Sequence, residues 1–221
     1  MTTSSRWPGL ALIAGAIVTV AAEAISASAW TVRPYSYAAD YINFLGAPFT
    51  GTFDGIVIAS PLWFVMSTGW ILSGLLIGAA GFRLSRALSG RRRSLVAVLS
   101  VAQAIGLVLF ATIPLGPDTI ASGRLWLYLV GAFLSVIAGN ALVLTAASSW
   151  RQLGLPKRAA VATMLLGIVG LLSIPVTYGW APIGIAERIS VYTFLAGVVI
   201  IGVSLLVKVR RAAGSARSRS N

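Results

Sequence analysis

The acidic side chains are the groups in this sequence best suited to chemistry, and there are only five: Glu23, Asp40, Asp54, Asp118 and Glu187. Carboxylates can transfer protons, bind divalent ions or pair with arginine. Glu23 is the most informative, because it interrupts an otherwise apolar stretch. A bare carboxylate at the centre of a membrane costs on the order of 2.5–3.5 kcal/mol. We therefore expect Glu23 to be protonated, paired or facing a wet cavity.

Two arginines are the natural partners of these carboxylates. Arg124 and Arg188 each stand at the beginning of a long apolar stretch, where a positive charge at a helix N-terminus is unfavourable. A nearby carboxylate from Glu23, Asp118 or Glu187 would compensate that charge. Two interpretations follow: an ion pair that only locks helix ends together, and a polar pocket, open to the outer face, that binds a ligand.

The segment between the first two apolar stretches is about thirty residues long, more than a usual connection. The spacing of its aromatic and aliphatic residues between Tyr37 and Leu45 suits a short amphipathic helix. Such a segment either anchors at the membrane surface, which we favour, or folds back over the bundle as a lid. With its two polar residues included, the candidate ligand-binding residues are Glu23, Asp40, Asn43, Asp118, Arg124, Glu187 and Arg188.

Long apolar helices must position these residues. The 221 residues are 57% hydrophobic and 10% charged, with a mean hydropathy of +0.90, whereas a soluble domain carries about 25% charged residues. Continuous apolar runs of about 20 residues predict membrane-spanning helices rather than strands. Six stretches qualify: residues 8–30, 61–82, 94–113, 125–147, 159–178 and 189–207. We predict an all-α, six-helix transmembrane bundle over residues 1–211 and a disordered basic tail over 212–221.

The distribution of lysine and arginine predicts the orientation. With both termini on the cytoplasmic side, fourteen of the seventeen basic residues lie inside, and only Arg33, Arg124 and Arg188 lie outside. The positive-inside rule therefore favours N-in and C-in. We expect a multi-pass protein of the cell membrane, whose partners are the bilayer and, at the cytoplasmic face, anionic lipid headgroups.

Several classes of function are excluded or disfavoured by composition. The chain has no cysteine and no histidine, which removes thiol chemistry, disulfides, the commonest metal ligand and the usual neutral-pH general base. We expect no cofactor and no metal. The net charge of +12 lies in short segments that flank apolar stretches, so lipid contact explains it better than nucleic-acid binding.

Two questions stay open: whether the first span is cleaved, and whether the chain forms a homo-oligomer. Arg6 followed by an apolar run and small residues at Ala27 and Ala29 is also the pattern of a cleavable signal peptide, although the run is longer than usual. Gly74 with Gly78, and the small residues from Gly131 to Gly139, permit close helix approach. We favour contacts within one chain over a homo-oligomer.

The segment from Tyr35-Ser36 to Asp40-Tyr-Ile-Asn-Phe-Leu-Gly46 resembles a signature of the domain-of-unknown-function 998 family. The turn from Ile113-Pro114 to Arg124-Leu125, and the turn Gly184-Ile-Ala-Glu-Arg188, resemble later motifs of that family. The resemblance implies a bacterial membrane protein of six helices, unassigned activity and a retained first span. Members commonly carry a histidine where this chain has Trp126, so no role of that histidine carries over.

Three functions remain compatible with the sequence. The first, which we favour, is a non-enzymatic membrane protein that binds a small molecule or lipid in the outward-facing pocket. The second is a small proton-coupled transporter that uses Glu23 as the coupling carboxylate. The third is an intramembrane hydrolase or transferase that uses Glu23, Asp40 and Asp118 for acid–base chemistry.

Overall fold

The computed structural model describes residues 5–53, 55–176 and 182–217. Its elements in chain order are α1 (Trp7–Ser28), η1 (Ile42–Gly46), β1 (Thr50–Phe53), β2 (Ile56–Ala59), α2 (Trp63–Ser85), α3 (Gly90–Thr112), α4 (Pro117–Ala121), α5 (Leu125–Ser148), α6 (Trp150–Leu153), α7 (Lys157–Val176) and α8 (Ile183–Arg217). Six of these helices are long and apolar enough to cross a membrane. The predicted all-α, six-helix bundle is confirmed.

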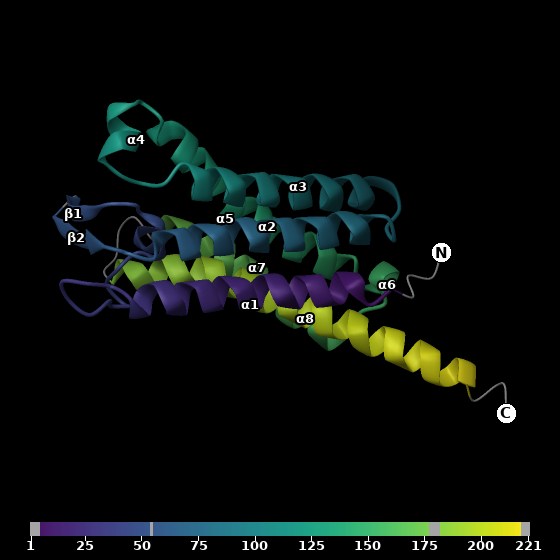
Figure 1. Cartoon of the computed structure of the whole chain (residues 1–221). Coiled ribbons are helices and arrows are strands. Elements are labelled where there is room, and N and C mark those ends of the chain that lie inside the picture. Colours follow the sequence, from purple (N-terminus) through teal and green to yellow (C-terminus); the bar gives the residue numbers. More distant parts are fainter. Residues whose placement is uncertain (1–4, 54, 177–181, 218–221) are drawn as a thin grey trace.

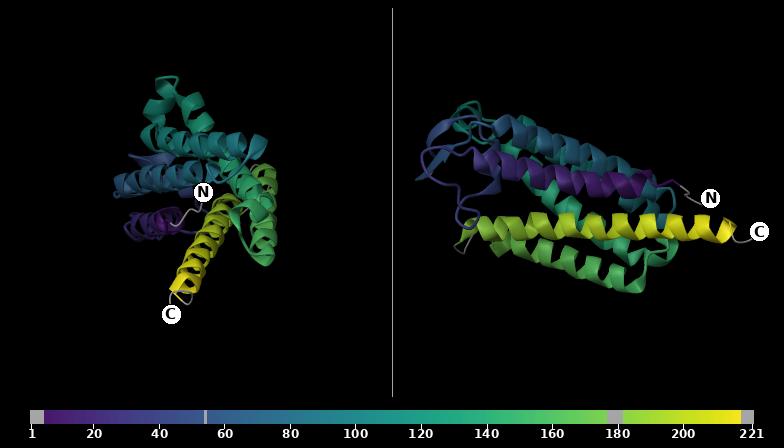
Figure 2. Two further views of the ribbon diagram at one scale, coloured as in Figure 1. Left: turned by 90° about the vertical axis from the view of Figure 1, so that its right-hand side faces the viewer. Right: turned by 60° about the horizontal axis from the view of Figure 1, so that its bottom comes forward.

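The six long helices form a closed ring. Going around it, α1 packs on α2, α2 on α3, α3 on α5, α5 on α7, α7 on α8, and α8 back on α1. The helices run roughly side by side, and both ends of the chain lie at the same end of the bundle (Figures 1 and 2). A ring of this kind encloses a central space, which only side chains from several helices can fill.

Close contact between neighbouring helices depends on glycine. A Cβ atom on Gly106 of α3 would stand 2.4 Å from the backbone nitrogen of Ser135 in α5, and one on Gly78 would stand 2.7 Å from Cβ of Ala104. A methyl group at either position would force the helices apart. The small residues that the sequence singled out on α2 and α5 therefore serve contacts within one chain.

Three details of the secondary structure differ from the sequence-based prediction. Helix α8 begins at Ile183, six residues before the expected span, and continues to Arg217 through part of the tail that we expected to be disordered. Its last turns contain lysine, arginine and alanine, which are strong helix formers. A short antiparallel hairpin pairs Thr50 with Ala59 where no strand was expected. The last two residues of the predicted span 159–178 lie outside the described residues, as does Asp54.

The two ends of the bundle are built differently (Figure 1). One end, here the loop end, carries residues 29–62, α4 and the first turns of α5 and α8. The other, the basic end, carries both chain ends, α6 and the arginine-rich connection between α2 and α3. At the loop end, Ile42, Phe44 and Leu45 of η1 are buried, and η1 packs on α2, α1 and α8. The segment after α1 is thus a lid on the bundle, the alternative that the sequence favoured less.

Candidate functional site

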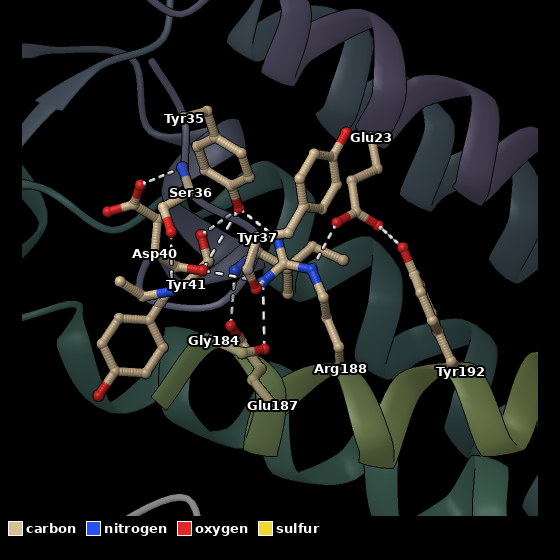
Figure 3. Close-up of polar contacts among 12 residues, drawn as sticks. Glu23, Tyr35, Ser36, Tyr37, Asp40, Tyr41, Gly184, Glu187, Arg188 and Tyr192 are labelled. Atoms are coloured by element: carbon tan, nitrogen blue, oxygen red, sulfur yellow. Dashed lines mark hydrogen bonds and ion pairs between the residues drawn. The ribbon is translucent and has the colours of Figure 1, made fainter. Parts of the chain in front are cut away.

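A buried ion pair joins α1 to α8 at the loop end (Figure 3). The Nε atom of Arg188 donates to Oε1 of Glu23 at 2.8 Å, and the hydroxyl of Tyr192 donates to Oε2 at 2.7 Å. Only 1% of Glu23 and 7% of Arg188 are exposed. Of the three states expected for Glu23 (protonated, paired or facing a wet cavity), the structure shows the paired one. Its partner is Arg188 rather than Arg124.

The same arginine holds the lid. Its Nη1 atom donates to the carbonyl oxygens of Tyr37 at 2.6 Å, Asp40 at 2.9 Å and Gly184 at 3.1 Å, and its Nη2 atom donates to the hydroxyl of Tyr35. The guanidinium also lies 5.0 Å from the centre of the Tyr37 ring. Arg188 thus uses the donors of its fork-shaped head on fixed protein acceptors, which leaves it poorly suited to hold a ligand anion.

A glycine permits the lid to approach α8. A Cβ atom on Gly184 would stand 2.5 Å from the carbonyl oxygen of Asp40 and 2.8 Å from that of Ala38. The carbonyl of Ala38 instead accepts a hydrogen bond from the backbone N–H of Ile185 at 3.2 Å. Loop carbonyls therefore satisfy one of the amide groups that a helix N-terminus leaves without an intrahelical partner.

A second ion pair shapes the lid itself. Arg33 binds both carboxylate oxygens of Asp40, with Nη1 2.8 Å from Oδ2, and the backbone N–H of Ser36 donates to Oδ2 at 2.7 Å. Burial works to raise the pKa of Asp40, but the bonds from Arg33 and Ser36 outweigh it and hold the pKa below the ordinary value of 3.8. Burial raises the pKa of Tyr35, so its phenol keeps its proton and donates it to the carbonyl of Tyr41 at 3.0 Å.

Glu187 is the acidic residue that faces a cavity. Its Oε2 atom accepts a hydrogen bond from the backbone N–H of Ile42, at the beginning of η1, at 2.6 Å. Among the described residues, no arginine or lysine forms an ion pair with it; the pairs are Arg33 with Asp40 and Arg188 with Glu23. Asn43 follows Ile42 in the lid, and its Nδ2 atom donates to the hydroxyl of Tyr128 at 2.7 Å.

A cavity of about 450 Å³ lies inside the ring, beneath η1. Its walls are mostly apolar and aromatic and come from α1, α2, α3, α5 and α8, with one contribution from α7. Residues that represent these walls are Thr19, Trp70, Phe110, Leu129, Val191 and Ile174. A concave, largely apolar space with a few polar groups is the ordinary form of a small-molecule site.

Several polar atoms on the cavity wall have no hydrogen-bond partner. Within the described part of the chain they are Oγ of Ser73, both amide atoms of Gln103, and the Oδ1 atoms of Asn43 and Asn140. Ser73 and Gln103 are fully buried. Leaving a buried amide without a partner costs about 1–3 kcal/mol, so these groups point to a molecule, water or ligand, that would complete them. We did not select Ser73 or Gln103 from the sequence, although a glutamine inside an apolar stretch is a usable signal.

Asn140 of α5 is a structural polar residue beside the same cavity. It is fully buried, and its Nδ2 atom donates to the carbonyl oxygens of Val136 and Ser190, each at 3.0 Å. Its Oδ1 atom faces Gly170 of α7, where a Cβ atom would stand only 2.0 Å away. Asn140 therefore ties α5 to α8 and packs on α7.

The structure does not bring Asp118 and Arg124 into this site. Asp118 lies on α4 and Arg124 just before α5; both are exposed, and neither forms an ion pair within the described part of the chain. Arg124 instead donates to the hydroxyl of Ser122 at 2.9 Å. The pairing expected from the sequence fails because α4 and the first turn of α5 project away from α1 and α8 (Figure 1).

The fold and its apolar helices define the protein as a polytopic integral membrane protein with contact to the lipid bilayer. No family model matches the chain, and neither a curated protein nor a solved structure matches it.

Proposed function

We propose that this protein binds a small amphipathic molecule or lipid in the cavity beneath its lid. The observation that carries the proposal is the group of partnerless polar atoms on Ser73, Gln103 and Asn43, which line a mostly apolar space of about 450 Å³. A molecule with an apolar body and hydrogen-bonding groups would fill the space and complete those bonds.

The bilayer can supply such a molecule. Leu129 and Phe133 of α5 line the cavity and are also 40% and 37% exposed. Towards the loop end, by contrast, η1 closes the space with buried side chains such as Leu45. An apolar molecule would therefore meet less obstruction between helices than through the lid.

The orientation is part of the proposal. Thirteen of the sixteen lysines and arginines in the described part of the chain belong to segments of the basic end, so the positive-inside rule favours a cytoplasmic basic end and a lid on the outside of the cell membrane. Anionic headgroups would then lie against the basic end.

The transporter and hydrolase hypotheses relied on free carboxylates. Glu23 and Asp40 each form an ion pair with an arginine. Asp118 is exposed and does not line the cavity. These positions support structural roles for the first two and give no carboxylate pair for acid–base work, so we propose binding alone.

Membership of the domain-of-unknown-function 998 family is also a proposal. It is supported by the residues that carry the resemblance, since Tyr35, Asp40 and Arg188 come from two separated motifs and meet in one cluster. Shared motifs that meet in space are typical of a common site.

Binding can be tested with the fluorescent amphipath 1-aminoanthracene on the full chain in detergent. We expect saturable binding that weakens at least about tenfold, or 1.4 kcal/mol, in Ala132→Phe, because the ring would occupy the cavity that Ala132 lines. Ala79→Phe is the matched control, since Ala79 is exposed on α2 and does not line the cavity. Equal binding by the two variants would contradict the proposal.

A further inference from the structure

Charges in the cluster around Arg188 do not balance. Glu23 pairs with Arg188, and Asp40 pairs with Arg33. Glu187 is the third acid of this cluster, and within the described residues it has no ion-pair partner of its own. The hydrogen bonds to its carboxyl group come from neutral backbone N–H groups, those of Ile42 and Asn43. Three carboxyl groups against two guanidinium groups leave one negative charge to be neutralised.

Position decides how that charge can be neutralised. Glu187 is half-buried in the first turns of α8 and lines the mostly apolar cavity beneath η1. An isolated carboxylate in apolar surroundings is costly, so it must take up a proton or meet a cation. The nearest cation, Arg188, already binds Glu23, Tyr35 and three backbone carbonyls.

Aromatic rings line the same cavity. Tyr41, Phe110 and Tyr128 line it together with Glu187, and Phe110 stacks on Tyr128 with ring centres 5.1 Å apart. Trp70 adds a further face, 4.5 Å from the ring centre of Phe110. Aromatic faces attract organic cations, and several faces with one carboxylate form the usual site for a quaternary ammonium group.

We propose that the cavity selects an organic cation, an amine or quaternary ammonium group on an apolar body, and that Glu187 supplies the counter-charge. This inference rests on the proposed binding function and names the class of ligand. The cationic group would lie between Glu187 and the aromatic walls, and the apolar body would extend towards the partly exposed side chains of Leu129 and Phe133.

Two probes of the same shape test the proposal: phenyltrimethylammonium, which is charged, and its neutral isostere tert-butylbenzene. Both are titrated into the full chain in detergent, and binding is measured by equilibrium dialysis. We expect the wild type to bind the cation at least about tenfold more tightly than the neutral probe, a difference of 1.4 kcal/mol. Glu187→Gln should lose this preference and still bind tert-butylbenzene, because glutamine keeps an acceptor for Ile42.

Asp118→Asn is the matched control, since it removes an equal charge from an exposed position outside the cavity, and it should bind like the wild type. Equal affinity of the wild type for both probes would overturn the inference and leave the proposed binding function standing, with a proton neutralising Glu187. A preference that survives in Glu187→Gln would overturn it too. Binding of neither probe would count against both proposals. The comparison of the two probes on the wild type does not depend on any variant folding.

Discussion

The cluster around Arg188 at the loop end and the arginines of the basic end are held in opposite ways. At the basic end, arginines such as Arg91 and Arg210 are exposed, and the few contacts are single ones, for example Arg92 with the carbonyl of Ser148 at 2.8 Å. At the loop end, Arg188 and Glu23 are buried and make several bonds each. Charges near water need no protein partner, whereas charges inside the bundle must be satisfied by it.

The difference predicts where the protein is sensitive to mutation. Removing one partner of a buried ion pair leaves an uncompensated charge, while removing an exposed charge changes little. The two ends also have different roles in our proposal. The basic end contacts lipid headgroups, and the loop end fixes a lid over the cavity.

The largest effect is expected for Arg188→Met. This change leaves Glu23 without its cation and releases three lid carbonyls, so the free energy of unfolding in detergent should fall by about 3–5 kcal/mol. The matched change at the basic end, Arg210→Met, should stay within about 0.5 kcal/mol of the wild type. Chemical unfolding followed by circular dichroism measures both. Equal losses would show that burial does not separate the two ends.

A smaller, pH-dependent effect is expected for Asp40→Asn. Because the folded pKa of Asp40 lies below its ordinary 3.8, its contribution is fully present above pH 3.8 and is lost as the pH falls through the folded value. At pH 7 the variant should be less stable by about 1–2 kcal/mol, a range that allows for the partly exposed Arg33.

Thermal unfolding midpoints between pH 7 and pH 3 test this prediction. The gap between wild type and Asp40→Asn should narrow as the pH drops below 3.8. A gap that stays constant over this range would mean that the charge of Asp40 does not hold the lid.

The cavity predicts a gain in stability rather than a loss. In ligand-free protein, Gln103→Leu removes two buried polar atoms that have no partner, so the free energy of unfolding should rise by about 1 kcal/mol. Gln152→Leu at the basic end should instead lower it slightly, because Gln152 accepts a bond from the backbone N–H of Ser89 at 3.0 Å. A clear loss in Gln103→Leu would indicate that its amide is already satisfied by a bound molecule.

The smallest effect is expected for Lys208→Ala. The ammonium group of Lys208 donates to the carbonyl of Leu153 at 2.9 Å, just before the left-handed Gly154 (φ 68°) that ends α6. The side chain is exposed, so its loss should cost only about 0.5 kcal/mol. Thermal unfolding at low and high salt should give nearly the same small difference, and a loss as large as that of Arg188→Met would remove the contrast between the ends.

Much of the site could be anticipated from residue types, but its pairing could not. Glu23 and Arg188 attract notice because each breaks a tendency of membrane helices. Which arginine meets Glu23 depends on the ring order, in which α1 packs beside α8, the helix that carries Arg188. Asp118 and Arg124 carry the same local signals, yet they lie outside the site because the helices that hold them stand across the ring.

The sequence by itself determined the number of spans and their approximate bounds, because crossing a bilayer demands about 20 apolar residues whatever lies around them. It also separated a basic end from an acidic one. Only the tertiary structure decided that the long loop is a lid, that Gln103 and Ser73 line an unfilled space, and that Glu187 faces the cavity without an ion-pair partner among the described residues. Those properties depend on which side chains from distant segments come within hydrogen-bond distance, and no local pattern records that.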